Sequence, residues 1–275
     1  MCIRVGALLL IPPLFVFIMN PFSEKSASKP DIHVRFYEEK DAEAVRALFV
    51  SGVMHGEDCA FEVGQRYLMR EHIVLPAYAL LGLGLAAMLP KESPVCFVGQ
   101  KTLSAVLCAT AIAWVGFWRW RLALNFQAYC DHSLSSDLAD IPQYYAALKS
   151  KDTGDDDGGA SGFWVAEAVS SDGAKHVVGC VGLDSRTQKD KSRCELRRMY
   201  VSDDFRRRGI AGKLINTLIA HARERGVGII VLSTTTYQEL ARMMYQRLGW
   251  VEVGQIPRLV WFMRSLQLHM LERAI

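Results

Sequence analysis

The sequence predicts an α+β (α/β) fold, with a mixed central β-sheet flanked by helices and a hydrophobic helical hairpin inserted into it. Three observations support this prediction. In the last third of the chain, short apolar segments alternate with helical segments and glycine-containing turns, as strand–helix–strand units do. A strand pattern followed by a helix pattern also stands at 31–54. Two long runs with almost no charge, 73–90 and 94–118, separate these parts.

The first predicted strand and helix share the segment Asp31–Met54. Ile32, Val34 and Phe36 alternate with the period of two that is typical of a strand. Asp41 is placed to cap the helix that follows, whose apolar residues recur at helical spacing.

The hydrophobic insertion 73–118 is predicted to be a membrane hairpin. Its two apolar runs hold one charged residue, Lys101. Each run approaches the roughly 20 residues that a helix needs to cross a bilayer, so two spans and a re-entrant hairpin both fit. Arginines flank the insertion on both sides, at Arg66, Arg70, Arg119 and Arg121. Since basic residues mark the cytosolic side, both ends are expected there. A buried helical pair in a soluble core is the alternative.

The remaining elements follow from apolar periodicity and from Gly and Pro positions. The predicted strands are 163–169, 176–183, 194–201, 228–233, 250–253 and 259–264, and the predicted helices are 135–148, 209–225 and 237–248. Ser136 or Asp137 is placed near the start of the first of these helices, and 149–162 is predicted to be a flexible polar loop. The expected domain plan is an N-terminal apolar segment and linker (1–30), one domain (31–265) interrupted by the hairpin, and a C-terminal tail (266–275).

Charge and cysteine content exclude several classes of protein. The 32 Lys and Arg residues nearly balance 29 Asp and Glu residues, which argues against a polyanion-binding protein, and no nucleic-acid partner is expected. Seven dispersed cysteines without a Cys-x-x-Cys pair indicate reduced thiols rather than a disulfide framework or a zinc site. The acidic run in 149–162 lacks the spaced ligands of a calcium loop, so no metal is expected.

A basic, glycine-containing turn between a strand and a helix carries the clearest chemical signal. The first amides of a helix have no internal partners and lie at the positive end of its dipole, which together favour phosphate. Gly209 and Gly212 remove side chains where the backbone must turn and be approached. The candidate phosphate-binding residues are Arg206, Arg207, Arg208, Gly209, Ile210, Ala211, Gly212 and Lys213. A Walker A loop and a dinucleotide fingerprint are absent from this turn, and taken alone the motif equally fits a helix start with solvated arginines.

Two motifs in order resemble the Gcn5-related N-acetyltransferase superfamily. Arg206-x-x-Gly209-x-Ala211 matches the first signature, and Tyr245 followed by Gly249-Trp250 matches the second. The segments DLADIPQYY, FWVAE, VVGCVGL and ELRRMYV are similar to the camello-type branch, and within it to the L-aspartate N-acetyltransferases. That branch also carries a membrane insertion. The resemblance implies the superfamily's fold and acetyl-CoA as co-substrate.

The resemblance also implies roles for residues outside the turn. Backbone groups of Met199, Tyr200 and Val201 would pair with the pantetheine arm, and the Val201 amide would face the thioester oxygen. Tyr245 would donate a proton to the departing sulfur; a packed core tyrosine is the alternative. Glu195 is the candidate base for the amine, with an exposed strand-edge carboxylate as the alternative.

The resemblance implies that the acceptor is a small amino acid, L-aspartate above all, and arginines suit its carboxylates. Arg198 aligns with an arginine of the aspartate-specific strand, and Arg197 replaces an apolar residue. Strand alternation predicts that the two point to opposite faces, so that only one reaches the substrate. A cysteine S-conjugate or a protein lysine, and a non-catalytic acyl-CoA-binding role, stay open. The resemblance implies the endoplasmic reticulum membrane, with the catalytic domain in the cytosol.

Overall fold

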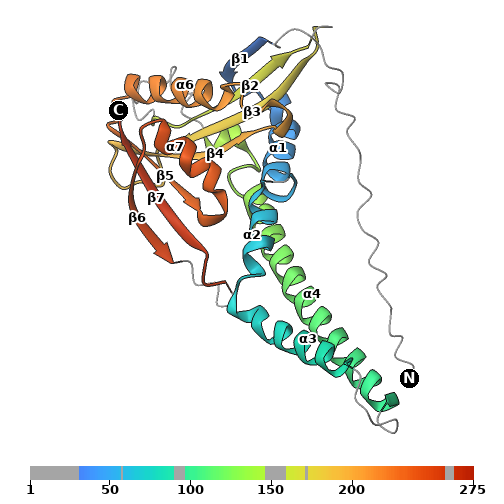
Figure 1. The fold of residues 1–275 in the computed structure, drawn as a ribbon. Coiled ribbons are helices and arrows are strands. Elements are labelled where there is room, and N and C mark those ends of the chain that lie inside the picture. The colour runs from blue at the N-terminus through green and yellow to red at the C-terminus, as the bar shows by residue number, and fades with distance from the viewer. Residues whose placement is uncertain (1–30, 57, 90–96, 146–158, 171–172, 258–262) are drawn as a thin grey trace, which may run out of the picture.

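The computed structural model describes residues 31–56, 58–89, 97–145, 159–170, 173–257 and 263–275. The chain forms one seven-stranded sheet in the order β1-β2-β3-β4-β5-β7-β6 (Figure 1). All neighbouring strands are antiparallel except β4 and β5, which are parallel. The strands are β1 (Asp31–Phe36), β2 (Gly162–Val169), β3 (Lys175–Asp184), β4 (Arg193–Val201), β5 (Ile229–Thr235), β6 (Val251–Pro257) and β7 (Gln267–Ala274). The mixed sheet that the sequence predicts is confirmed.

Helices cover both faces of this sheet. They are α1 (Ala42–Met54), α2 (Ala60–Leu68), α3 (Leu75–Ala87), α4 (Phe97–Ser135), α5 (Ile141–Tyr144), α6 (Ile210–Glu224) and α7 (Glu239–Arg247). The apolar stripe of α6, with Leu214 and Leu218 fully buried, packs with Tyr245 of α7 in one core cluster that includes Trp164. On the other face, Phe49 of α1 and Cys130 of α4 pack against Val165 and its neighbours on β2 and β3. The core therefore has two layers of side chains, one on each side of the sheet.

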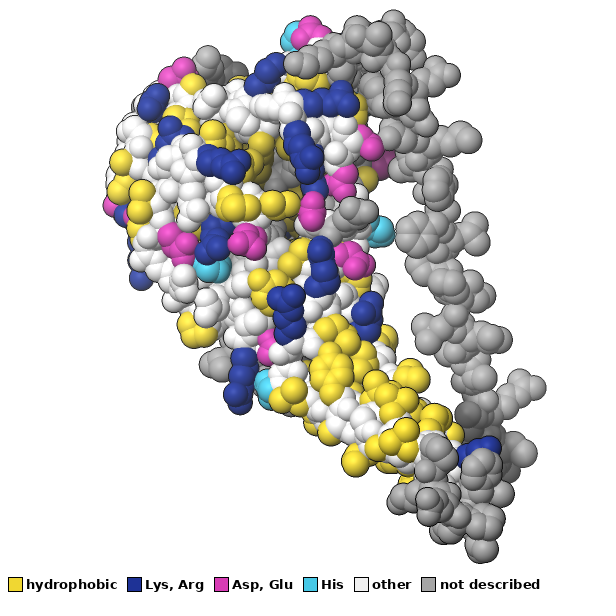
Figure 2. Space-filling view, in the orientation of Figure 1, with side chains coloured by type: hydrophobic (Ala, Val, Ile, Leu, Met, Phe, Trp, Pro, Cys, Tyr) yellow, Lys and Arg dark blue, Asp and Glu magenta, His cyan; other side chains and the backbone are white. Residues whose placement is uncertain are grey.

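The helices α3 and α4 run together away from the sheet as a hairpin (Figure 1). Large apolar side chains on the hairpin are exposed to solvent, among them Leu83 at 61% and Ile112 at 70%. Figure 2 shows these side chains as a continuous apolar surface at the end of the molecule, with a band of Lys and Arg above it. The segment Gly99–Ser135 of α4 is long and apolar enough to cross a membrane. The pair formed by α2 and the segment His72–Ala87 passes the same test only if its 54° bend counts as one broken span.

A third cluster fastens the hairpin to the domain. Val74 and Ala77 at the start of α3 pack with Leu122 of α4 and with Tyr237 and Met263 from the C-terminal part of the chain. The hairpin and the sheet therefore share a packed junction, which holds them in one orientation relative to each other.

Two predicted helix starts need correction. The segment predicted as one helix over 135–148 instead holds the end of α4, a turn, and the short α5, with residues from 146 onwards outside the described residues. Asp140, and not Ser136 or Asp137, caps α5 by accepting from the Gln143 amide at 2.8 Å. Asp41 precedes α1 as predicted, but its carboxylate binds Arg35 at 2.6 and 2.9 Å instead of capping the helix. Asp137 and Asp41 each bind an arginine, Arg198 and Arg35, in place of the helix amides.

The predicted strand 259–264 falls mainly on residues that the structure does not describe, whereas the predicted tail 266–275 holds a strand. Residues 258–262 lie outside the described residues, and Met263 is buried against Tyr237, whose hydroxyl lies 3.4 Å from its sulfur. The last strand is β7, which pairs with β5 on one side and β6 on the other. The apolar run at 259–263 masked the weaker alternation of β7. The other predicted strands and the helices 209–225 and 237–248 are confirmed within a few residues. The N-terminal segment 1–30 and most of the loop 149–162 lie outside the described residues.

Adjacent residues of β7 give a matched test of this register. Leu271 is fully buried on the α7 side of the sheet, whereas Met270 points to the other side and is 36% exposed. We expect Leu271→Ala to lower the free energy of unfolding by about 2–5 kcal/mol, and Met270→Ala to lower it far less. Chemical denaturation of the purified protein in detergent measures both. Equal and negligible losses would show that this segment is a dispensable tail.

Candidate functional site

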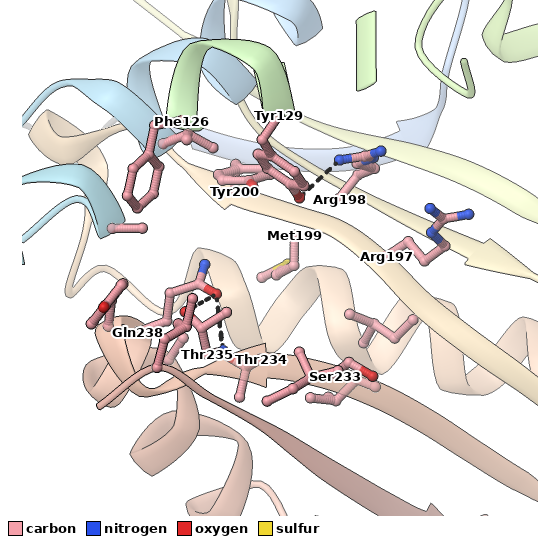
Figure 3. A pocket seen from close by; sticks show the side chains of 18 of the residues that line it. Phe126, Tyr129, Arg197, Arg198, Met199, Tyr200, Ser233, Thr234, Thr235 and Gln238 are labelled. Carbon is pink, nitrogen blue, oxygen red and sulfur yellow. Dashed lines mark hydrogen bonds between the residues drawn. The ribbon is translucent and has the colours of Figure 1, made fainter. Parts of the chain in front are cut away.

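The parallel strands β4 and β5 separate soon after they meet. They pair at Arg193–Ile229, Cys194–Ile230 and Glu195–Val231, and no further pair follows along these two described strands. Beyond Glu195 the facing backbone edges are left without a strand partner, and a cavity of about 590 Å³ lies between them (Figure 3). An unpaired strand edge offers hydrogen-bonding groups to an extended ligand.

The cavity passes from one face of the sheet to the other. Its walls come from β4 (Glu195–Tyr200), β5 (Leu232–Thr235), α7 (Ala241, Tyr245) and α4 (Leu122, Asn125, Phe126, Tyr129). Tyr245 belongs to the core cluster on the α6 and α7 side, whereas Tyr200 packs with the cluster on the α1 side. In Figure 3, Phe126 and Tyr129 of α4 stand across the opening from Thr234 and Thr235 of β5. The helix that continues from the hairpin therefore forms one wall of the cavity.

A β-bulge in β4 sets the direction of its side chains. Gly182 pairs with Arg197 and Cys180 with Tyr200, so that two residues of β4, Arg198 and Met199, oppose one residue of β3. Arg198 has a φ of 53°, which is a left-handed conformation that side chains rarely adopt. The bulge interrupts the alternation of the strand. Arg197 and Arg198 therefore lie on the same face, and the prediction of opposite faces was wrong.

Arg198 forms a buried ion pair with Asp137, from the turn between α4 and α5. Nε and Nη2 of Arg198 donate to the two carboxylate oxygens at 2.7 and 2.5 Å, and the two side chains are 7% and 1% exposed. Tyr145 donates its hydroxyl to the same carboxylate at 3.0 Å. Burial alone would raise the pKa of the Asp137 carboxyl, but the hydrogen bonds and charge of Arg198 hold that pKa below its ordinary value. The pair is therefore ionised at neutral pH.

Arg197 lines the same cavity and has its own carboxylate. Its Nη1 donates to the hydroxyl of Tyr144 at 3.0 Å and to the fully buried carboxylate of Asp184 at 3.2 Å. The side chain of Arg197 is 25% exposed, more than that of Arg198. The structure thus brings both predicted substrate arginines to the cavity, each already bound to an acidic side chain.

Tyr245 and Glu195 line this cavity too. Tyr245 is 6% exposed, and its ring meets that of Trp250 at 5.6 Å between centroids. Burial raises the pKa of the Tyr245 phenol well above its ordinary value of 10, so the hydroxyl keeps its proton at neutral pH. Glu195 occupies the last position at which β4 still pairs with β5. A proton donor and a carboxylate therefore share one cavity, and their catalytic roles stay predictions.

The predicted phosphate-binding turn follows β4 by a short helical turn at 203–205. Gly209 has a φ of 79° and precedes α6 without any side-chain cap, and the first amide with a carbonyl partner is that of Lys213, bound to Gly209 at 3.1 Å. A Cβ atom added to Gly209 or Gly212 would meet no atom within 4 Å. The amides of Ile210, Ala211 and Gly212 therefore begin a helix beside open space, as an anion site requires.

The cations of this turn are not equivalent. Arg206 is bound to Asp203 at 2.7 Å, and the Lys213 ammonium donates to the Ile32 carbonyl at 3.1 Å. Arg207 and Arg208 are exposed, and the Arg208 guanidinium lies 5.1 Å from the centre of the Phe205 ring. The turn and Val201 are not among the residues that line the cavity, so the structure places them beside it, at the end of β4.

Sequence reasoning missed Asp137, Tyr129 and Phe126 as site residues. Asp137 was assigned to a helix start, because capping is the usual role of an aspartate before a helix. Tyr129 and Phe126 belong to the long helix α4, which by sequence alone continues a membrane segment. Among the described residues, no group of three His, Cys, Asp or Glu side chains is placed to hold a metal ion.

Comparison with known proteins gives one matching family and the following similar proteins. Residues 126–250 match the family described as Acetyltransferase (GNAT) family. N-acetylaspartate synthetase of Danio rerio is 31% identical over 237 residues, which cover 86% of this chain and 72% of that protein. N-acetyltransferase 8 of Homo sapiens is 30% identical over 241 residues, which cover 86% and 91%. A crystal structure of a GNAT-family acetyltransferase from Staphylococcus aureus Mu50 covers 89% of this chain and 99% of its own, at 15% identity and a TM-score of 0.48.

Proposed function

Because the chain belongs to the GNAT family of acetyltransferases and is an acetyl-CoA-dependent N-acetyltransferase, we propose that it acetylates the amine of a small amino acid, L-aspartate, at a membrane surface. The observation that carries this proposal is the cavity between β4 and β5, which holds an unpaired strand edge, a protonated tyrosine and two arginines. The acceptor is proposed from those arginines and from the name of the Danio rerio relative.

The residues present fit acetyl-CoA in two places. The open amides at the start of α6 suit its pyrophosphate, with Arg207 and Arg208 as nearby cations. The free edge of β4 at Met199–Val201 suits the amide-containing pantetheine arm. Bound acetyl-CoA supplies an activated acetyl group as a thioester.

The chemistry assigns one proton movement to each of two side chains. Glu195 takes a proton from the acceptor's amine, directly or through water, so that the nitrogen can bond to the acetyl carbon. As that C–N bond forms, the C–S bond breaks, and Tyr245 donates its proton to the departing sulfur. The products are the N-acetyl amino acid and coenzyme A. The low-dielectric surroundings that keep Tyr245 neutral also strengthen these interactions.

The apolar part of the cavity lining is compatible with a second class of acceptor. Leu122, Phe126 and Met263 give one side of the cavity an apolar character that would suit a cysteine S-conjugate. A dicarboxylate instead needs two cationic contacts, which Arg197 and Arg198 can provide together because the bulge turns them to the same face. This last observation favours L-aspartate.

A panel of amines tests the reaction and the acceptor together. With acetyl-CoA, we expect release of free thiol to be fastest with L-aspartate, slower with L-glutamate, and at background with S-benzyl-L-cysteine, a lysine peptide or no amine. Tyr245→Phe should lower kcat by about 10²–10⁴-fold, whereas Tyr78→Phe, on the hairpin, should leave it unchanged. Full activity of Tyr245→Phe would remove its acid role. Background rates with every amine would refute the enzyme proposal.

The open space at Gly212 provides a separate test of the phosphate site. We expect Gly212→Leu to raise the KM for acetyl-CoA by about tenfold or more, because the new side chain would cover the free amides. Stability should hold or rise, since leucine favours a helix by roughly 1 kcal/mol over glycine. Ala220→Leu, on the exposed side of the same helix, is the matched control. An unchanged KM for acetyl-CoA in Gly212→Leu would place the pyrophosphate elsewhere.

We also propose that the hairpin inserts into the cytosolic leaflet of the endoplasmic reticulum as a re-entrant loop. The 13 residues of α3 span about 20 Å, less than the roughly 30 Å of a bilayer's hydrocarbon core. In the sequence, Arg70 precedes α3, and Arg119 and Arg121 follow the uncharged part of α4. Trp114 and Trp120 are exposed near the C-terminal end of the apolar part of α4. Tryptophan side chains favour the membrane–water interface.

Flotation with lipid vesicles tests this placement. The double change Leu83→Asp and Ile112→Asp should abolish flotation with phosphatidylcholine–phosphatidylserine vesicles, because each buries a charge in hydrocarbon. Leu240→Asp, at an equally exposed leucine on α7, should not. In intact microsomes, added protease should digest the acetyltransferase domain. Full protection of that domain would contradict the cytosolic orientation.

A further inference from the structure

Asp137 is the acidic partner of the cavity's most buried arginine, yet it does not line the cavity itself. It lies 61 residues before Arg198 in sequence, in the turn that follows α4. Arg198 lines the cavity and Asp137 stands behind it. The carboxylate can therefore act on a ligand only through Arg198.

The guanidinium of Arg198 is held on several sides. Asp137 accepts from two of its nitrogens, and the third, Nη1, lies 3.3 Å from the hydroxyl of Tyr129, the contact drawn in Figure 3. The ring of Phe49 lies 5.0 Å from the guanidinium carbon. Asp137 is itself fixed by the Tyr145 hydroxyl. Because Nη1 carries two protons, one remains for a ligand beside Tyr129.

The backbone makes this support necessary. Arg198 occupies the left-handed position of the bulge, where a non-glycine residue is retained only if its surroundings determine it. The thiol of Cys180, on β3, donates to the Arg198 carbonyl at 3.3 Å, which is a weak hydrogen bond. The two strong bonds that hold Arg198 come from Asp137.

We propose that Asp137 is a positioning residue for the acceptor: by its two-point contact it aims the free Nη1 proton of Arg198 at a carboxylate of the amino-acid substrate. This inference rests on the proposed amino-acid acceptor. It also means that the turn ending the hairpin helix α4 completes the acceptor site. Arg197 and Asp184 form a comparable pair, in which the arginine is more exposed than Arg198. The contact of Arg197 with the second carboxylate of the substrate is therefore adjustable, whereas that of Arg198 with the first is rigid.

The effect of a positioning residue differs from that of a purely structural one. We expect Asp137→Asn to raise the KM for L-aspartate by about tenfold, with the KM for acetyl-CoA within a factor of two. Asp140→Asn, three residues away, makes the same carboxylate-to-amide change at the cap of α5, where the amide oxygen can still accept from Gln143, and should leave both constants unchanged. Coenzyme A should raise the melting temperature of Asp137→Asn as much as that of the unaltered protein, which shows that the cofactor half of the site is intact.

A double-mutant cycle separates action through Arg198 from general damage. If Asp137 works by positioning Arg198, Asp137→Asn combined with Arg198→Gln should be no worse than Arg198→Gln alone. Should Asp137→Asn fail to fold, Tyr145→Phe removes one bond to the carboxylate without leaving a charge unpaired. It should raise the KM for L-aspartate about threefold and leave the KM for acetyl-CoA unchanged.

Two results would overturn the inference. In one, the KM for L-aspartate in the double variant rises by the product of the two single effects. In the other, Asp137→Asn raises the KM for L-aspartate and the KM for acetyl-CoA together. The proposed acceptor fails separately, if the unaltered protein prefers another amine over L-aspartate. The variants are then measured with that preferred amine. Non-additive effects of Asp137→Asn and Arg198→Gln on the KM for that amine would support positioning. An unchanged KM for that amine in Asp137→Asn would refute it.

Discussion

The separation of β4 from β5 after three residue pairs is the constraint on which the site depends. Two parallel strands that stayed paired would leave neither a free backbone edge nor room for side chains between them. The bulge at Arg198 places one extra residue of β4 against β3, within the part of β4 that no longer pairs with β5. Tyr245 on one side of the sheet and Arg198 on the other then face the same cavity.

Buried ion pairs hold this opened geometry. A buried pair adds little stability compared with apolar packing, since both charges lose their water, but removing one partner leaves an uncompensated charge. Asp137 with Arg198 and Asp184 with Arg197 are therefore better understood as devices that specify where each guanidinium stands. The left-handed backbone at Arg198 costs about 1–2 kcal/mol, and the two strong hydrogen bonds to Asp137 offset it.

The helix α4 links this site to the apolar hairpin. Its 39 residues, Phe97–Ser135, begin in the exposed apolar hairpin, and Cys130 near the other end of the helix is buried against the sheet. Along the way Phe126 and Tyr129 form a wall of the cavity. The packed junction of Val74 with Leu122 and Tyr237 keeps the hairpin in register with the sheet. One continuous helix thus sets the position of the cavity relative to whatever surface receives the hairpin.

Local patterns in the sequence determined most of the secondary structure, the apolar hairpin and the glycine turn before α6, because each depends on residues close together in the chain. The resemblance to a known family, and not periodicity, identified Tyr245, Glu195 and Arg198 as candidates. Tertiary structure alone decided that β7 lies between β5 and β6, and that Arg197 shares a face with Arg198. It alone decided that Asp137 binds Arg198 instead of capping a helix. Strand order, a bulge and a buried ion pair arise from contacts between distant segments, and periodicity within one segment carries no information about them.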